Sequence, residues 1–254
     1  ALLTWGDYLY NVGTLHSFYK AQKEKTTLVF APVLCGAGLF ILIKGFAAAD
    51  VVNDTFYLFF YLLLGALWVR VWMPWLRLMG IFWRDDALER KNHSALFVVI
   101  AFIFGATACY GGANIGDGPG WWCVVVAGGI ATLAWLLLWQ ILMVVGGLSE
   151  KITVERDLSA GIRTAGYGIG SSIICGRGAA GDWTSALQTV IEFSSAWPVI
   201  ALLILAILVE KLSGPPKSNQ EYQQHSPSHF MAIVLASFYI VISIIIVYYS
   251  PSLP

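Results

Sequence analysis

Charged residues are scarce in this chain of 254 residues. Asp, Glu, Lys and Arg together make up 12% of it, whereas soluble domains average about 25%. So few charges cannot cover a surface that faces water, which excludes a soluble globular enzyme. The acidic and basic residues balance at 15 each, so no net charge indicates a nucleic-acid partner. With 58% hydrophobic residues and a mean hydropathy of +0.72, the composition predicts a membrane protein.

The chain also has few residues suited to a metal or a prosthetic group. Its four cysteines lie in apolar runs without paired short spacing, which predicts buried free thiols. None of the four histidines lies in the middle of an apolar run, so haem or chlorophyll would lack an axial imidazole. The last apolar run has no lysine, which excludes a retinal Schiff base. Because catalytic motifs such as Gly-x-Ser-x-Gly are missing too, we expect no cofactor and no enzymatic activity.

Long apolar runs are what the chain has instead. Seven of them approach the length of about 20 residues that a helix needs to cross a bilayer. We therefore expect an all-α polytopic transmembrane helix bundle of about seven spans. The fifth run is the least apolar, because Arg163 and several glycines dilute it. The expected spans are Thr27–Ala48, Thr55–Ile81, Ser94–Gly112, Trp121–Val145, Ser159–Gly176, Trp183–Val209 and His229–Tyr249.

Basic residues are missing from one set of loops. Asp50–Asp54, Ala113–Pro119 and Gly178–Asp182 contain no Lys or Arg, and only Lys44 and Arg177 lie near that side. The positive-inside rule therefore places these loops and the C-terminus outside and the N-terminus in the cytoplasm. The basic residues assigned to the cytoplasmic side are Lys20, Lys23, Lys25, Arg84, Arg90, Lys91, Lys151, Arg156, Lys211 and Lys217.

Residues 1–26, which precede the first expected span, carry one apolar stripe. Its members recur mostly at three- and four-residue intervals, and lysines follow them. This pattern is typical of an amphipathic helix that lies in the cytoplasmic membrane interface. A helix that packs on the bundle or docks a partner is the alternative. The stripe consists of Trp5, Tyr8, Leu9, Val12, Leu15 and Tyr19.

An internal repeat occupies the middle of the chain. A shift of 65 residues places Arg84–Asp117 over Ser149–Asp182 without a gap. Each unit holds a charged linker, a glycine-bearing helix, a short Gly-Asp turn and an apolar returning helix. Two spans return the chain to the same side, so the repeats are parallel and lack the inverted arrangement of many transporters. The shift pairs Asn92 with Asp157, Gly105 with Gly170, and Asp117 with Asp182.

Each unit opens with a short motif, Asn92-His93-Ser94-Ala95 in the first and Asp157-Leu158-Ser159-Ala160-Gly161 in the second. In the YjfL-like family of bacterial inner-membrane proteins, whose function is uncharacterised, each unit has an Asn followed by small residues that open a glycine-bearing helix. The units of this chain resemble the units of that family. The second unit departs from that pattern by having Asp in place of Asn. The resemblance covers residues 55–182 and implies a bacterial inner membrane but no activity. Residues 27–54 add a span and an outer loop, and residues 183–254 add a helix pair with a cytoplasmic loop.

Ionisable residues inside the expected spans are the candidate functional residues, because an unpaired charge in hydrocarbon is costly. Glu192 could carry a proton or cation, or serve only as an interfacial or helix-pairing carboxyl. Arg70 and Arg77 share one helix face and could snorkel to headgroups or form an anion site with Arg84. Arg163 could snorkel or pair with an acid in a cytoplasmic linker.

Small residues suggest two structural roles. Gly166 and Gly170, four residues apart, predict close helix packing. The string Gly166–Gly170 superficially resembles a potassium-filter sequence, but it lies in a full-length span, which excludes that function. In the turns Gly116-Asp117 and Gly181-Asp182, we expect each Asp to cap the N-terminus of the returning helix.

Two functions of different class fit these features. The first is a non-enzymatic, helix-packing membrane component that works as a homo-oligomer or with other membrane subunits, surrounded by membrane lipids. The alternative is a proton- or ion-conducting bundle that uses Glu192, with Asp117 and Asp182 at its outer mouth.

The orientation can be tested with single cysteines at positions 117 and 219. In intact cells, a membrane-impermeant thiol reagent should label Asp117→Cys, which we expect outside, and should spare Asn219→Cys, which we expect in the cytoplasm. Labelling of position 219 from outside would contradict the orientation.

Overall fold

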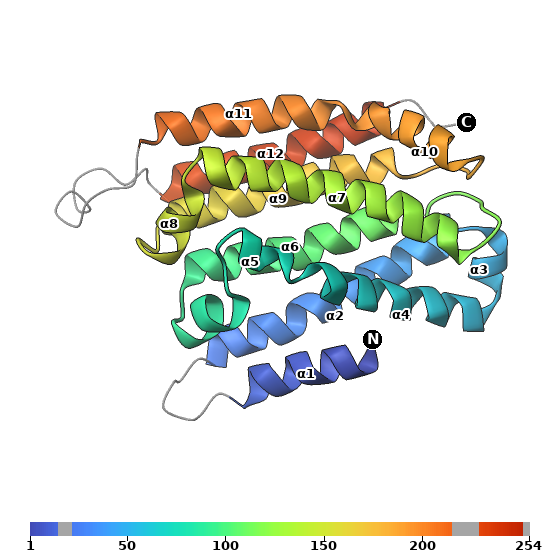
Figure 1. Ribbon diagram of the computed structural model, residues 1–254, viewed down its shortest axis with the longest axis horizontal. Coiled ribbons are helices and arrows are strands. Elements are labelled where there is room, and N and C mark those ends of the chain that lie inside the picture. The colour runs from blue at the N-terminus through green and yellow to red at the C-terminus, as the bar shows by residue number, and fades with distance from the viewer. Residues whose placement is uncertain (15–21, 215–228, 251–254) are drawn as a thin grey trace.

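The computed structural model describes residues 1–14, 22–214 and 229–250, and the regular secondary structure of these residues is helical. Short π-helical and 3-10 turns, η1 (Trp83–Glu89) and η2 (Ser194–Ala196), interrupt the α-helices. The α-helices, shown in Figure 1, are α1 (Leu2–Gly13), α2 (Gln22–Phe46), α3 (Ala49–Asn53), α4 (Thr55–Trp72), α5 (Trp75–Leu78), α6 (His93–Gly112), α7 (Trp121–Val145), α8 (Leu148–Thr153), α9 (Leu158–Gly178), α10 (Ala186–Phe193), α11 (Pro198–Leu212) and α12 (His229–Tyr249).

The described chain has five helices long and apolar enough to cross a membrane: α2, α4 continued by α5, α6, α7 and α12. The fold is therefore that of a multi-pass helical membrane protein. The bounds of α7 and α12 agree with the sequence prediction, and those of α2 and α6 lie within a few residues of it. These helices could be predicted because a bilayer imposes a minimum apolar length that a sequence shows directly.

The expected span Trp183–Val209 is not one straight helix. It is broken into α10 and α11, which are bent by 43° relative to each other and count as a sixth candidate span only if taken together. Pro198 is the first residue of α11, a position that proline favours because the amide hydrogen it lacks has no partner there. The prediction of a continuous helix missed this break.

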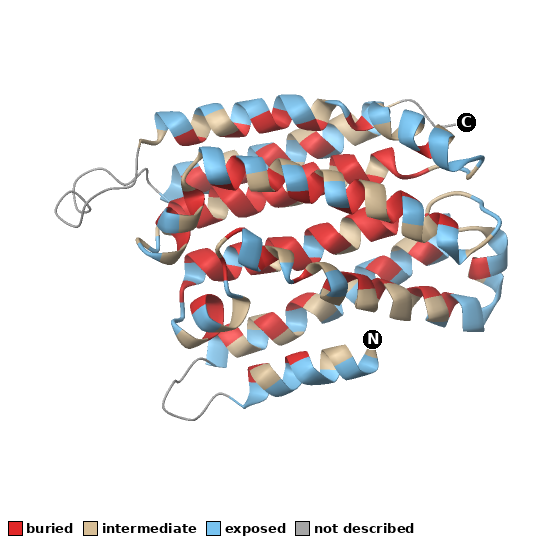
Figure 2. Cartoon of the chain, in the orientation of Figure 1, coloured by how far each residue is buried: buried red, intermediate tan, exposed pale blue. Residues whose placement is uncertain are grey.

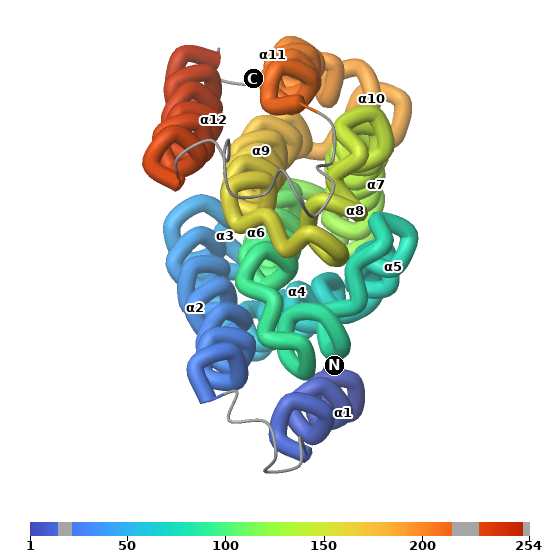
Figure 3. The backbone as a smooth tube through the Cα atoms, turned by 90° about the vertical axis from the view of Figure 1, so that its left-hand side faces the viewer, coloured from blue at the N-terminus to red at the C-terminus, as the bar shows by residue number. Residues whose placement is uncertain are grey.

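Helix α9 corresponds to the expected fifth span, but it is not among the five helices that are long and apolar enough to cross a membrane. It lies at the centre of the bundle, where α6, α12, α7 and α11 pack around it (Figure 3). Most of its residues are buried (Figure 2). A helix that neighbouring helices cover in this way needs no apolar surface of its own.

Helices α6, α9 and α12 form a row of parallel neighbours. Where they begin, Ser94 Oγ donates to the Asp157 carbonyl oxygen at 2.7 Å, and Ser159 Oγ lies 3.1 Å from His229 Nδ1. Toward their other ends, Gly112 lies against the backbone of Gly176. We call the end of the bundle where this row begins the linker end, and the end that holds the Gly-Asp turns the turn end.

The linkers that precede α6 and α9 have the same local geometry. Lys91 and Arg156 both adopt positive φ angles, of 51° and 55°, which is uncommon for residues other than glycine. The next residue caps the helix in both cases: the Asn92 side chain accepts from two backbone amides of α6, and the Asp157 side chain from two of α9. The 65-residue shift pairs these positions, so corresponding residues of the two units have corresponding local roles.

Helix α1 packs on the bundle, and its axis runs alongside α2 (Figure 1). Tyr8 and Val12 are buried, the Trp5 indole donates to the Ala66 carbonyl oxygen at 2.8 Å, and Tyr8 donates to that of Leu28 at 3.0 Å. This arrangement favours the bundle-packing interpretation over the interfacial one. The last part of the predicted stripe, including Leu15 and Tyr19, lies outside the described residues.

The close packing of α9 against α12 can be tested at Gly170. A Cβ atom there would lie 2.6 Å from the Tyr239 carbonyl oxygen, which real side chains do not tolerate. We expect Gly170→Ala to lower the free energy of unfolding in detergent by about 1–3 kcal/mol. Gly38→Ala is the matched control, because Gly38 has no neighbour within 4 Å of its added Cβ. Equal thermal stability of the two variants would contradict the packing.

Candidate functional site

A buried ion pair joins α9 to α11. Arg163 Nε and Nη2 donate to the two carboxylate oxygens of Glu210 at 2.7 and 2.8 Å. The side chains are only 2% and 3% exposed. Such a two-bond pair fixes both side chains and neutralises two charges that would otherwise be costly in the core.

The sequence prediction for Arg163 was thus correct in part. Arg163 does pair with an acid, but the partner lies in the last turn of α11 rather than in a linker, and burial of the guanidinium contradicts snorkelling. Glu210 had not been singled out, because it stands just beyond the end of an expected span. The signal that could have found it was the lack of any other acid in the half of that span that leads to Glu210.

Arg70 lies under α1 instead of reaching toward lipid headgroups. Its guanidinium is 5.4 Å from the centre of the Tyr8 ring and 6.0 Å from that of Trp5, and Nη2 is 3.8 Å from the carboxylate of Asp7. Cation–π contacts and a nearby carboxylate explain why this charge is tolerated on a span. Arg70 therefore helps to dock α1 on α4.

The three arginines proposed for an anion site do not share one. Arg84 donates from Nη1 to Asn11 Oδ1 at 2.6 Å and from Nε to Glu89 Oε1 at 3.0 Å, so it pairs with α1 and with a neighbouring acid rather than with Arg70 or Arg77 around an anion. Arg77 is exposed on α5, which a break at Pro74 separates from α4. The expectation of a shared anion site is not supported.

The two Gly-Asp turns bind each other rather than cap the returning helices. The Asp182 carboxylate accepts from the Asp117 backbone amide at 2.7 Å, and the Trp183 amide donates to the Asp117 carbonyl oxygen at 2.7 Å. The N-cap residues of α7 and α10 are instead Gly120 and Ser185. The capping prediction was therefore wrong. The glycines of both turns take positive φ angles, of 108° at Gly116 and 144° at Gly181.

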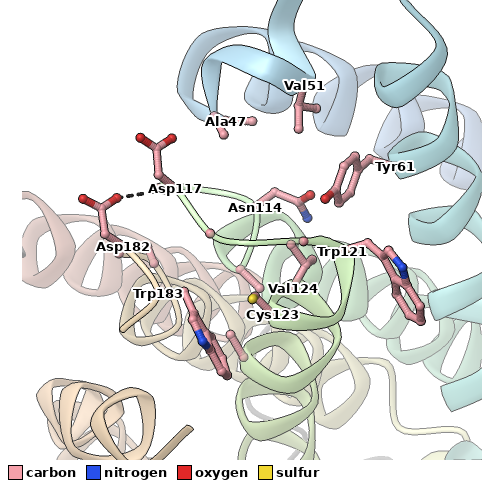
Figure 4. A pocket seen from close by; sticks show the side chains of 18 of the residues that line it. Ala47, Val51, Tyr61, Asn114, Asp117, Trp121, Cys123, Val124, Asp182 and Trp183 are labelled. Carbon is pink, nitrogen blue, oxygen red and sulfur yellow. Dashed lines mark hydrogen bonds between the residues drawn. The ribbon is translucent and has the colours of Figure 1, made fainter. Parts of the chain in front are cut away.

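A cavity of about 360 Å³ opens at the turn end, beside the paired turns (Figure 4). Residues of α3, α4, α7, α10 and both turns line it. The lining includes four carboxylates and no Lys or Arg: Asp50, Asp117, Asp182 and Glu192. The structure thus brings together the three acids that the conduction hypothesis had grouped and adds Asp50, which the sequence analysis had missed.

Glu192 lies near the turn end of the bundle. It is half-buried in α10 and accepts from Gln188 Nε2 at 2.9 Å. Its helix ends at Phe193, short of the bend, so Glu192 belongs to the cavity and not to the packed interior below it. Below the cavity, the core contains large buried side chains such as Phe102, Trp135 and Trp139.

The inner part of the cavity holds two buried polar residues, Tyr61 and Asn114, which are 8% and 4% exposed. The amide nitrogen of Asn114 donates to the Tyr110 carbonyl oxygen at 2.7 Å, which fixes the orientation of the side chain. Nowhere in the described residues do three or more His, Cys, Asp or Glu side chains converge in a way that could hold a metal ion. The cavity therefore combines an acidic rim with an aromatic and polar interior.

The remaining predicted residues have structural roles. Gly105 lies against the ring of Trp135, and Gly170 against the backbone of Tyr239. Asn92 and Asp157 are the helix caps described above. Comparison with protein-family models, with curated proteins and with solved structures gives no match for the chain.

The Arg163–Glu210 pair predicts an asymmetric mutational response. Glu210→Gln leaves a buried guanidinium without a counter-charge and should lower the free energy of unfolding by about 3–5 kcal/mol. The control, Glu89→Gln, removes the half-exposed partner of Arg84 and should cost less than about 1 kcal/mol.

Replacing both buried residues, by Arg163→Met with Glu210→Leu, should restore most of the stability, because no buried charge remains. Thermal unfolding in detergent measures all three variants. A Glu210→Gln variant no less stable than Glu89→Gln would contradict the role of the pair.

Proposed function

We propose that the chain is a seven-span protein of a bacterial inner membrane that serves as a non-enzymatic, helix-packing component of a homo-oligomer or a larger membrane complex. In this proposal α9 counts as a span because its neighbours shield it from lipid. The linker end lies in the cytoplasm and the turn end outside, in accord with the positive-inside rule. The matched linkers before α6 and α9 support the tandem repeat and the likeness to the YjfL-like family.

One observation carries this proposal: the row of α6, α9 and α12 is open at α12. Helix α12 packs on α9 through a narrow face of Ala232, Ala236, Tyr239 and Ser243. Its other faces are exposed and consist largely of bulky apolar side chains. These are Phe230, Met231, Ile233, Val234, Phe238, Val241, Ile244 and Ile245. A helix anchored on one side only offers a broad apolar surface to another subunit.

The buried interior supports the same conclusion. Glycines bring α9 into backbone contact with α6 and with α12, so this part of the bundle is closely packed. The buried charges Arg163 and Glu210 neutralise each other. A subunit that contributes shape and contacts needs no further chemistry inside the membrane.

A second candidate is the proton- or ion-conducting bundle. Its support is the placement of Glu192, Asp117 and Asp182 around one cavity at the turn end. The large buried side chains of the core below the cavity favour the first candidate.

Native mass spectrometry of the full chain in mild detergent tests the proposal. We expect a mass of several copies, or of one copy with a further subunit. Ile233→Ser with Ile244→Ser, on the exposed flank of α12, should shift the protein toward the single chain. The matched control is Val33→Ser with Ile41→Ser on exposed positions of α2, which should not.

A wild-type protein that stays a single chain would contradict the proposal. If that protein also carried a cation flux into proteoliposomes that Glu192→Gln abolished, the conducting bundle would replace it.

A further inference from the structure

The cavity at the turn end has a one-sided charge. Asp50, Asp117 and Asp182 are exposed at its rim and Glu192 is half-buried in its wall, and no Lys or Arg is among its lining residues. Four acidic side chains without a basic residue among the lining make the potential in the cavity negative. A cleft lined by one sign of charge concentrates ions of the opposite sign.

The walls of the cavity are aromatic. Phe56, Tyr57, Phe60 and Tyr61 come from α4, and Trp121 and Trp183 follow the two turns. The faces of aromatic rings attract cations, and they attract them more strongly where water is partly excluded. Aromatic walls also favour a ligand with an apolar body, which a bare inorganic cation does not have.

Two polar atoms inside the cavity add hydrogen-bond acceptors. The Tyr61 hydroxyl and the Asn114 amide oxygen belong to side chains that are more than nine-tenths buried, and both residues line the cavity (Figure 4). Neither atom makes a hydrogen bond to another described residue, whereas the Asn114 amide nitrogen is engaged by Tyr110. Neither oxygen is sealed off from the cavity, so both acceptors are open to an N–H donor placed there.

We infer that this cavity is a binding site for an organic ammonium ion with a small aromatic or apolar body. The acidic rim attracts the charge, the aromatic walls hold the cation and its body, and Tyr61 and Asn114 accept from an N–H group. The volume of about 360 Å³ is within the range of small-molecule sites. The carboxylates do not converge as metal ligands do. The inference goes beyond the oligomer proposal and does not depend on it.

Isothermal titration calorimetry of the full chain in lipid nanodiscs tests the site, with empty nanodiscs as the baseline. The probes are benzylammonium, benzyltrimethylammonium and benzoate at equal ionic strength. Both cations should bind saturably, whereas benzoate, which has the same ring and the opposite charge, should not. Saturable binding of benzoate, or cation heats no larger than those of empty nanodiscs, would overturn the inference without any variant.

Variants then assign the binding to this cavity. Asp182→Asn with Glu192→Gln should weaken both cations about fivefold or more, because two nearby charges are lost. Both amides keep an acceptor oxygen, so the bond from the Asp117 amide is preserved. Glu150→Gln, an exposed carboxylate at the linker end, is the matched control and should leave both affinities unchanged. Equal effects of the two changes would place the binding elsewhere and overturn the assignment.

Tyr61→Phe separates a specific site from general attraction by the rim. It keeps the aromatic ring and removes only the hydroxyl, so benzylammonium should lose about fivefold in affinity. Benzyltrimethylammonium has no N–H group and should bind as before. Cooperative melting of Tyr61→Phe shows that the variant is folded. If this folded variant loses affinity for both cations, or for neither, the role assigned to the Tyr61 hydroxyl is contradicted.

Discussion

Backbone-to-backbone packing along α9 is the constraint on which the rest of the bundle depends. Gly161 and Gly176 lie against α6, and Gly166 and Gly170 lie against α12, at distances where an added Cβ would overlap its neighbour. Close approach of this kind maximises van der Waals contact between helices in a membrane, where the hydrophobic effect gives little driving force for association. It also keeps α9 in the centre, so a helix rich in Gly, Ser and Thr is compatible with an apolar surrounding.

The central position of α9 explains the ion pair and the turns. Because α9 is enclosed, Arg163 cannot reach water, and Glu210 of α11 supplies the counter-charge that its burial requires. At the other end of the same helices, the contact of Gly112 with Gly176 brings the following turns together. The Asp117 amide then meets the Asp182 carboxylate, and the two turns become a single structural unit.

The paired turns in turn create the cavity. They hold two carboxylates at fixed positions beside α3, α4 and α10, which add Asp50, the aromatic walls and Glu192. The bundle therefore divides into two chemically different parts. Its interior is closely packed and its buried arginine is neutralised by Glu210, which suits a structural subunit, whereas its turn end is acidic, aromatic and open to a ligand.

Local features of the fold could be predicted from the sequence because their causes are local. Apolar length defined α6, α7 and α12, and motif position identified Asn92 and Asp157 at the starts of α6 and α9. The small-residue spacing of Gly166 and Gly170 likewise predicted close packing, since residues four apart share a helix face.

The partners of these features could not be predicted, because they depend on which faces of distant helices meet. Glu210 lies 47 positions from Arg163, and Asp182 lies 65 positions from Asp117. The 65-residue repeat makes Asp117 and Asp182 equivalent positions, but it does not show that their two turns touch, and no repeat relates Glu210 to Arg163. The sequence by itself therefore determined the long apolar helices and the membrane character. Only the tertiary structure decided that α1 packs on the bundle, that Arg163 is neutralised by Glu210, and that four scattered carboxylates surround one cavity, because each depends on packing between segments far apart in the chain.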